Sequence, residues 1–131
     1  MKKTVLPVLI VLLLAGCDKA SMMDANIKNN TTQNLSLIFF SASQSNDSLQ
    51  IESNQNKLFQ EGFSSTGGFL KPSLTQFDSI YIKNQSNEIL KVFKENTEGK
   101  NIYKVDEFWI FSEPLEQVYN YDYTINSEDI E

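Results

Sequence analysis

The sequence predicts an all-β fold, a small antiparallel β-sandwich or barrel of about 7–8 strands. From Asn26 onward, short apolar runs are separated by clusters of Asn, Ser, Thr and Gly. No apolar pattern with helical spacing continues for three turns, whereas several segments alternate apolar and polar residues with period two. Turn signals recur at intervals of roughly 8 to 12 residues, which is the spacing found in sandwiches and barrels.

An N-terminal signal peptide is expected to precede this fold. Lys2 and Lys3 give the chain a positive start, and an apolar run over residues 5–14 follows, as in secretory signal peptides. A bilayer core about 30 Å thick needs roughly 20 helical residues, so this run is too short for a permanent transmembrane helix. We therefore expect residues 1–16 to be removed.

The end of this signal resembles the lipobox of bacterial lipoproteins. Its residues are Leu14-Ala15-Gly16-Cys17, and the resemblance implies cleavage between Gly16 and Cys17 by the lipoprotein signal peptidase. A diacylglyceryl group then alkylates the Cys17 thiol, and the new amine is acylated. Two or more acyl chains give stable membrane anchoring, which one chain alone does not. The alternative is an ordinary signal peptide with a cysteine at this position by chance, but Cys17 is the chain's only cysteine and forms no intrachain disulfide.

Residues 17–25 are expected to form a lipidated tether. The stretch 18–24 has few large apolar residues apart from Met22 and Met23, and at roughly 3.3–3.6 Å per extended residue it would hold the domain within about 25 Å of the membrane. The remaining residues, 26–131, are enough for one β domain whose core needs neither disulfides nor metal.

Three strands are expected in the first half of this domain. They cover residues 35–40, 48–52 and 57–63, and the first places Leu35, Leu37 and Phe39 on one face. Gly62 is expected to mark a bulge in the third strand.

The second half contains the clearest hairpin. Segments 77–83 and 88–94 flank the polar turn 84–87, a connection suited to a β-hairpin. Segment 105–111 fits either a strand or one or two helical turns that stop before Pro114, and we favour the strand. A long strand is expected over 117–125, with one side formed by Tyr119, Tyr121, Tyr123 and Ile125.

Composition excludes several function classes. The chain has neither His nor Arg, so it cannot use Ser-His-Asp or Cys-His catalysis, imidazole metal ligation or guanidinium clamps. No metal or other cofactor is expected. Cleavage removes Lys2 and Lys3 but no acid, which moves the formal charge from −6 to −8. Nucleic acid and anionic lipid are therefore not expected as partners.

The remaining candidate sites have simpler structural interpretations. The three alternating tyrosines could form a binding platform, but core packing is the favoured interpretation, as it is for Trp109 with Phe108 and Phe111. The acids lack the pattern of a calcium loop. The triplets Asp47-Ser48-Leu49 and Asp78-Ser79-Ile80 resemble the Bacteroidetes O-glycosylation acceptor, which makes Ser48 and Ser79 candidate modification sites.

The chain is similar to small uncharacterised lipoproteins of flavobacterial, Bacteroidetes type. The similarity lies in the lipobox, the Asn/Lys/Ile/Ser-rich composition and segments 78–84 and 99–104. It implies an outer-membrane or periplasmic lipoprotein with a small β domain. Asp18 resembles an inner-membrane retention signal in enterobacteria but a surface-export signal in Bacteroidetes, and we favour the outer membrane.

These observations predict a membrane-anchored envelope lipoprotein with a noncatalytic binding or accessory domain. Its expected partners are the membrane, through lipid on Cys17, and an envelope protein or glycan. Two alternatives stay open: a carboxylate-dependent enzyme acting on glycans, and a structural component of the envelope.

Overall fold

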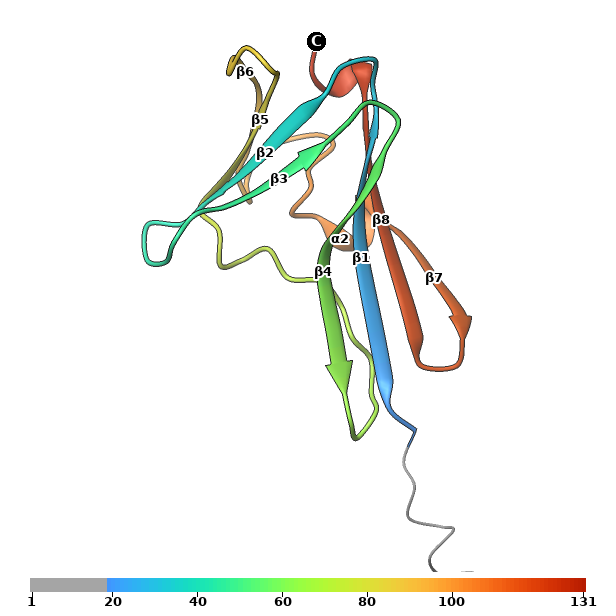
Figure 1. The fold of residues 1–131 in the computed structure, drawn as a ribbon. Helices are drawn as coiled ribbons and strands as arrows, with labels where there is room; N and C mark the ends of the chain where they lie inside the picture. The colour runs from blue at the N-terminus through green and yellow to red at the C-terminus, as the bar shows by residue number, and fades with distance from the viewer. Residues whose placement is uncertain (1–18) are drawn as a thin grey trace, which may run out of the picture.

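Two four-stranded sheets form the domain, as a computed structural model shows for residues 19–131 (Figure 1). The predicted signal peptide and the predicted lipidation site at Cys17 lie outside the described residues. The predicted all-β class and the sandwich are confirmed, and the two sheets do not close into a barrel. Eight strands are present in the described part of the chain.

Sheet A has the order β4-β1-β8-β7. Its strands are β1 (Ser21–Asn30), β4 (Asn56–Ser64), β7 (Ile110–Leu115) and β8 (Val118–Asn126). β1 pairs antiparallel with β4 but parallel with β8, so the prediction of purely antiparallel sheets is wrong for this pair. A parallel pair needs a long crossover connection, and here the whole of sheet B lies between β1 and β8 in the sequence.

Sheet B has the order β3-β2-β5-β6 and is antiparallel throughout. Its strands are β2 (Leu35–Phe40), β3 (Asp47–Ile51), β5 (Ser79–Lys83) and β6 (Ile89–Phe93). The predicted β5–β6 hairpin is confirmed. Its turn is set by Asn84, whose Oδ1 accepts hydrogen bonds from the backbone N–H groups of Ser86 and Glu88, and by Asn87 at φ 64°.

The folded domain begins earlier than predicted. β1 starts at Ser21, and Ser21, Met23 and Ala25 are all buried. Residues 21–25 of the predicted tether therefore belong to the domain, and the predicted domain start at Asn26 is wrong. Ser21 and Ala25 are small, so the sequence shows no clear row of large apolar residues at this strand. The period-two spacing of Met23, Ala25 and Ile27 was the signal that could have revealed it.

The bulge in β4 lies at Phe59, not at Gly62. Ala25 pairs with Gln60 and Asn26 pairs with Leu58, which leaves Phe59 without a partner in β1. The extra residue points inward, and its ring stacks on Phe39 of sheet B at a centroid distance of 5.0 Å.

Segment 105–111 contains both a helical turn and the start of a strand, the two structures considered for it from the sequence. One helical turn, α2 (Val105–Phe108), is followed by β7, so the favoured single strand was wrong. β7 lies at the edge of sheet A, and Pro114 falls in the register irregularity between Ser112 and Leu115, the kind of position where a sheet tolerates proline. Trp109 is buried as predicted, and its Nε1 donates to the Ile102 carbonyl at 2.7 Å. Phe111 is 47% exposed, so its assignment to the core was wrong.

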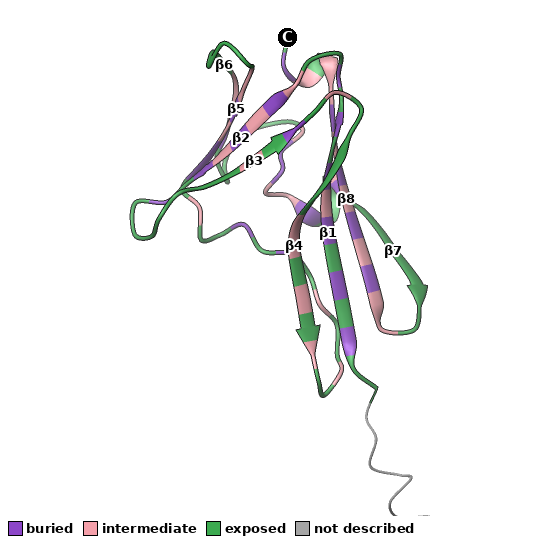
Figure 2. Ribbon diagram, viewed as in Figure 1, coloured by how far each residue is buried: buried purple, intermediate pink, exposed green. Residues whose placement is uncertain are grey.

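The core lies between the sheets, and β1 and β8 show its period most clearly (Figure 2). The predicted inward side of β8 is confirmed by its buried residues Tyr119, Tyr121, Tyr123 and Ile125. The inward face of β2 is confirmed in the same way by Leu35, Leu37 and Phe39.

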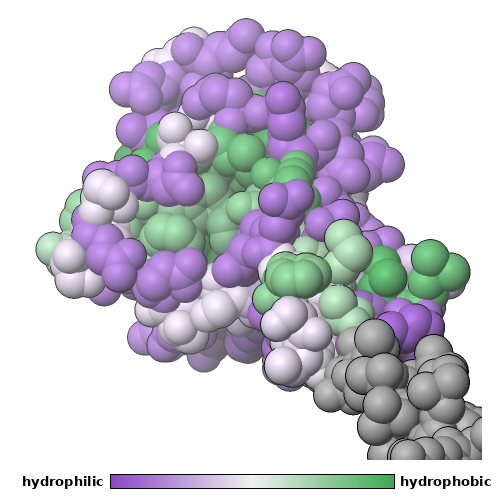
Figure 3. Space-filling view, turned by 60° about the horizontal axis from the view of Figure 1, so that its bottom comes forward, coloured by the Kyte–Doolittle hydropathy of each residue, from purple (hydrophilic) through white to green (hydrophobic). Residues whose placement is uncertain are grey.

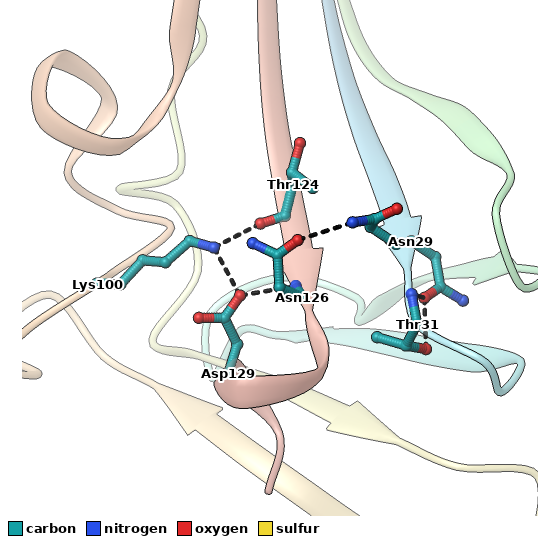
Figure 4. A network of polar contacts seen from close by, with 7 residues as sticks. Asn29, Thr31, Lys100, Thr124, Asn126 and Asp129 are labelled. Atoms are coloured by element: carbon teal, nitrogen blue, oxygen red, sulfur yellow. Dashed lines mark hydrogen bonds and ion pairs between the residues drawn. The ribbon is translucent and has the colours of Figure 1, made fainter.

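Polar contacts close the domain at the end where β1 finishes (Figure 4). The buried Asn29 side chain donates to the carbonyls of Gln33 and Ile51, and its Oδ1 accepts from both the N–H and the hydroxyl of Thr31. Lys100 Nζ donates to the Thr124 carbonyl at 2.7 Å and to Asp129 Oδ2 at 2.6 Å. These bonds satisfy the polar groups where the chain passes from one sheet to the other.

Candidate functional site

An exposed row of apolar side chains crosses the outer face of sheet A. The backbone register pairs Phe63 with Met22, Met22 with Val118, and Val118 with Leu115. Directly paired residues share a face of a sheet, so these four side chains form one line over all four strands. The exposed fractions are 69% for Phe63, 55% for Met22 and 69% for Leu115. We call these four residues the apolar row.

The apolar row lies at the end of the sheet where β1 begins. Ser21, one residue before Met22, is buried, and its hydroxyl lies 2.6 Å from the Gly68 carbonyl and 2.8 Å from Gln117 Oε1. The turns 64–68 and 115–118 therefore meet around the first residue of β1. We call these two turns with Ser21 the N-terminal tip.

A solvent-exposed ion pair joins the N-terminal tip to the preceding chain. Lys19 Nζ lies 2.9 Å from Glu116 Oε2. The hydrogen bond from Lys19, and then its charge, lower the pKa of Glu116. The pair places the Lys19 side chain beside the 115–118 turn.

Aromatic rings cover the other face of the same end. Phe69, 64% exposed, meets Tyr119 edge-on at a centroid distance of 5.1 Å and Phe111 at 6.0 Å. Phe111 also contacts Tyr121 at 5.1 Å. Burial, and then the charge of Asp106, raises the pKa of Tyr121. Both faces of this end thus present large apolar side chains, and Figure 3, which turns this end toward the viewer, shows hydrophobic residues exposed on it.

The outer face becomes acidic and polar beyond the apolar row. The next outward row consists of Glu61, Asp24, Asn120 and Ser112, and the row after it of Leu58, Asn26, Asp122 and Ile110. Exposed apolar side chains on this face are therefore concentrated in the row closest to the start of β1.

Two open cavities lie elsewhere in the described domain. One, of about 190 Å³, lies at the end opposite the N-terminal tip and is lined by four amide side chains together with Leu35, Ser36, Ile51 and Glu52. These amides belong to Asn34, Gln50, Asn84 and Gln85. The second, of about 420 Å³, is lined in part by Asp78, Lys94 and Glu95.

Tyr103 lies close to the carboxylates of this second cavity. Burial, and then the charges of Glu95 and Asp78, raise the pKa of Tyr103 to about 12. Its hydroxyl donates to the Phe77 carbonyl at 3.0 Å. The tyrosine therefore stays protonated over the whole physiological range.

The structure separates the two candidate glycosylation sites. Ser48 is exposed on β3, and its modification remains a prediction. Ser79 is only 4% exposed at the start of β5, so an enzyme could not reach it in the folded domain. Within residues 19–131, no group of three or more His, Cys, Asp or Glu side chains is arranged to hold a metal. None of the helices in this part of the chain could span a membrane.

Comparisons of the chain with protein-family models, with curated proteins and with solved structures found no significant match.

Proposed function

We propose that this protein is a lipid-anchored component of the cell envelope whose β domain binds a ligand without catalysis, with the outer membrane as its location. The observation that carries the proposal is the short spacing between Cys17 of the lipobox-like motif and Ser21, which is buried at the start of β1. Four residue steps at about 3.6 Å reach no farther than about 14 Å. A lipid on Cys17 would therefore fix the domain directly at the membrane surface.

The cavity at the far end of the domain is the proposed ligand site. Figure 1 places the β5–β6 hairpin, which contributes Asn84 and Gln85, opposite the end where β1 begins. A domain anchored at its N-terminus would present this cavity away from the membrane. The Asn84 amide is bonded within the hairpin turn, but the Gln85 side chain makes no hydrogen bond within the described domain and offers both a donor and an acceptor. This suits the hydroxyl groups of a neutral glycan.

Lipidation is tested on protein purified from membranes of the native host. We expect the intact mass to equal the chain from Cys17 to Glu131 plus a diacylglyceryl group, with or without an additional acyl chain on the amine. We expect palmitate incorporation to disappear in Cys17→Ser. An unmodified Cys17 thiol, or palmitate in Cys17→Ser, would contradict the anchor.

Ligand binding is tested with an array of neutral envelope glycans. Gln85→Ala should reduce binding, since Gln85 lines the cavity and is exposed. Gln55→Ala should not, because Gln55 is an exposed residue outside the cavity. Equal effects of the two variants would exclude this cavity as the ligand site.

One observation favours an enzyme as a second candidate function. Asp78 and Glu95 both line the second cavity, of about 420 Å³, and glycoside hydrolysis uses two carboxylates. Turnover of a glycan by the purified protein, lost in both Asp78→Asn and Glu95→Gln, would establish this activity. Crosslinking in cells to one abundant envelope protein would instead favour the other alternative, a structural role in the envelope.

A further inference from the structure

We propose that the apolar row rests in the headgroup layer of the same bilayer that holds the Cys17 lipid, with Phe69 contributing from the opposite face of the sheet. The partner surface is a zwitterionic phospholipid layer. The inference depends on the proposed lipidation of Cys17, and it adds a defined orientation of the domain on the membrane.

The length of the connecting chain supports this placement. Ser21 is fixed in β1, so only residues 18–20 separate the lipid attachment site from the buried strand. Their reach of about 14 Å compares with a headgroup layer of roughly 5–8 Å on each side of the hydrocarbon core. The first row after Ser21 can therefore lie at headgroup depth.

The distribution of side chains on sheet A agrees with the same placement. Phe63, Met22 and Leu115 project from the outer face, and Phe69 projects from the inner face at the same end. Aromatic and aliphatic side chains partition into the boundary between headgroups and acyl chains. No other outward row of this sheet that includes β1 combines more than two apolar residues.

Charge limits both the depth and the kind of lipid. Asp24 and Glu61 occupy the row immediately beyond the apolar row, so deeper insertion would bury carboxylates. Glu116 lies in the turn itself, with Lys19 as its partner. Anionic headgroups would repel this acidic end, because anionic membranes attract basic rather than acidic segments. A neutral, zwitterionic surface is the complementary one.

The test measures which side chains enter the lipid phase of the full, lipidated protein. A lipidated Cys17 carries no free thiol, so Leu115→Cys, Phe63→Cys, Ile110→Cys and Leu58→Cys would each provide a single site for a nitroxide label. Ile110 is 70% exposed and lies on the same strand and face as Leu115. It pairs with Asp122, four residues from Val118, so it lies about 13 Å from the apolar row. Leu58 is the corresponding control for Phe63 on β4.

In phosphatidylcholine vesicles, we expect labels at 115 and 63 to be reached by dissolved oxygen and to be several-fold less accessible to a water-soluble nickel chelate than those at 110 and 58. Phosphatidylglycerol should reduce this contrast. Circular dichroism confirms that each variant is folded.

Three results would overturn the proposal. If the intact mass shows lipid on Cys17 but all four labels are equally accessible to the nickel chelate, the proposed orientation is wrong while the proposed lipidation of Cys17 is retained. If labels at 115 and 63 are inaccessible to both oxygen and the nickel chelate, protein and not lipid covers the apolar row. If this protection increases with the density of protein on the vesicles, the covering protein is a second copy of this chain. If the reagent labels Cys17 itself, the anchor and the orientation both fail.

Discussion

The hydroxyl of Tyr123 is an uncommon feature of this core. Its residue is fully buried, and the hydroxyl has no hydrogen-bond partner among the described protein atoms. The ring itself is well packed, tilted against Trp109 at 5.5 Å and edge-on to Phe93 at 6.4 Å. The aromatic body of Tyr123 therefore stabilises the fold, while its polar end opposes burial.

Removing this hydroxyl should leave stability unchanged or improve it. Tyr123→Phe keeps the ring contacts and eliminates a buried, unpaired polar group, so we expect the free energy of unfolding in urea to rise by between zero and about 1 kcal/mol. Tyr103→Phe is the matched control, because its hydroxyl donates to the Phe77 carbonyl at 3.0 Å. That variant should lose about 1 kcal/mol. A loss at Tyr123 as large as at Tyr103 would show that the Tyr123 hydroxyl is bonded.

At the scale of elements, the 64–68 turn depends on the absence of a side chain at Gly67. Gly67 has φ +81°, and a Cβ there would lie 2.6 Å from both the Lys19 carbonyl and Gln117 Oε1. The turn can approach the start of β1 only because this position is glycine.

Gly67→Ala should loosen the N-terminal tip. We expect a loss of unfolding free energy larger than the roughly 1 kcal/mol of conformational strain alone, together with faster amide exchange at Met22, whose N–H donates to Gln117. Gly99→Ala is the control, since Gly99 has φ +76° with nothing within 4 Å of the added Cβ. Gly99→Ala therefore has the same backbone strain from a positive φ but no steric clash of the added Cβ. Equal losses in the two variants would contradict the close approach at Gly67.

Elements with a strong local pattern could be predicted from the sequence. β2 covers the predicted 35–40, and the β5–β6 hairpin has its predicted turn, because alternation and turn residues are local signals. The sequence predicts no strand at β1, because the small residues Ser21 and Ala25 occupy inward positions of this strand and weaken its apolar alternation. The bulge at Phe59 results from pairing with β1 and packing on Phe39, which no local pattern encodes.

The apolar row could not be predicted for a related reason. Met22 was assigned to the tether, Phe63 to the end of a strand, and Leu115 follows Pro114 outside any predicted strand. Only the register of β1 between β4 and β8 aligns them, and register across distant strands depends on the tertiary pairing. The spacing of Cys17 from β1 limits the reach of the chain because Ser21 is buried in the strand.

At the scale of the whole molecule, three tyrosines with raised pKa values contribute to how the stability of the fold responds to alkaline pH. Burial raises the pKa of Tyr103 to about 12 and also raises the pKa values of Tyr121 and Tyr123. In the unfolded chain these groups titrate near pH 10. Above that pH the folded state retains protons that the unfolded state releases, so the free energy of unfolding falls as pH rises.

We therefore expect the stability contributed by these tyrosines to be complete below about pH 9 and to decline from about pH 10 upward. The fully buried Tyr123 accounts for at most about 1.4 kcal/mol per pH unit of this slope. Urea unfolding at pH 8, 10 and 11 measures it, and Tyr123→Phe should flatten the slope. A slope identical in Tyr123→Phe would show that Tyr123 ionises equally in the folded and unfolded states.

The short link to Cys17 controls how the whole domain would sit on its membrane. A flexible Gly/Ser insertion of twelve residues between Asp18 and Lys19 would add a root-mean-square length of about 20 Å and lower the effective concentration of the apolar row at the surface. In the lipidated protein, we expect the nickel accessibility of a label at Leu115→Cys to rise toward that at Ile110→Cys, while the Ile110 value stays constant. An unchanged Leu115 value would mean that the row holds to lipid without help from the link. A rise at both positions would instead indicate that the insertion unfolds sheet A, which circular dichroism would detect.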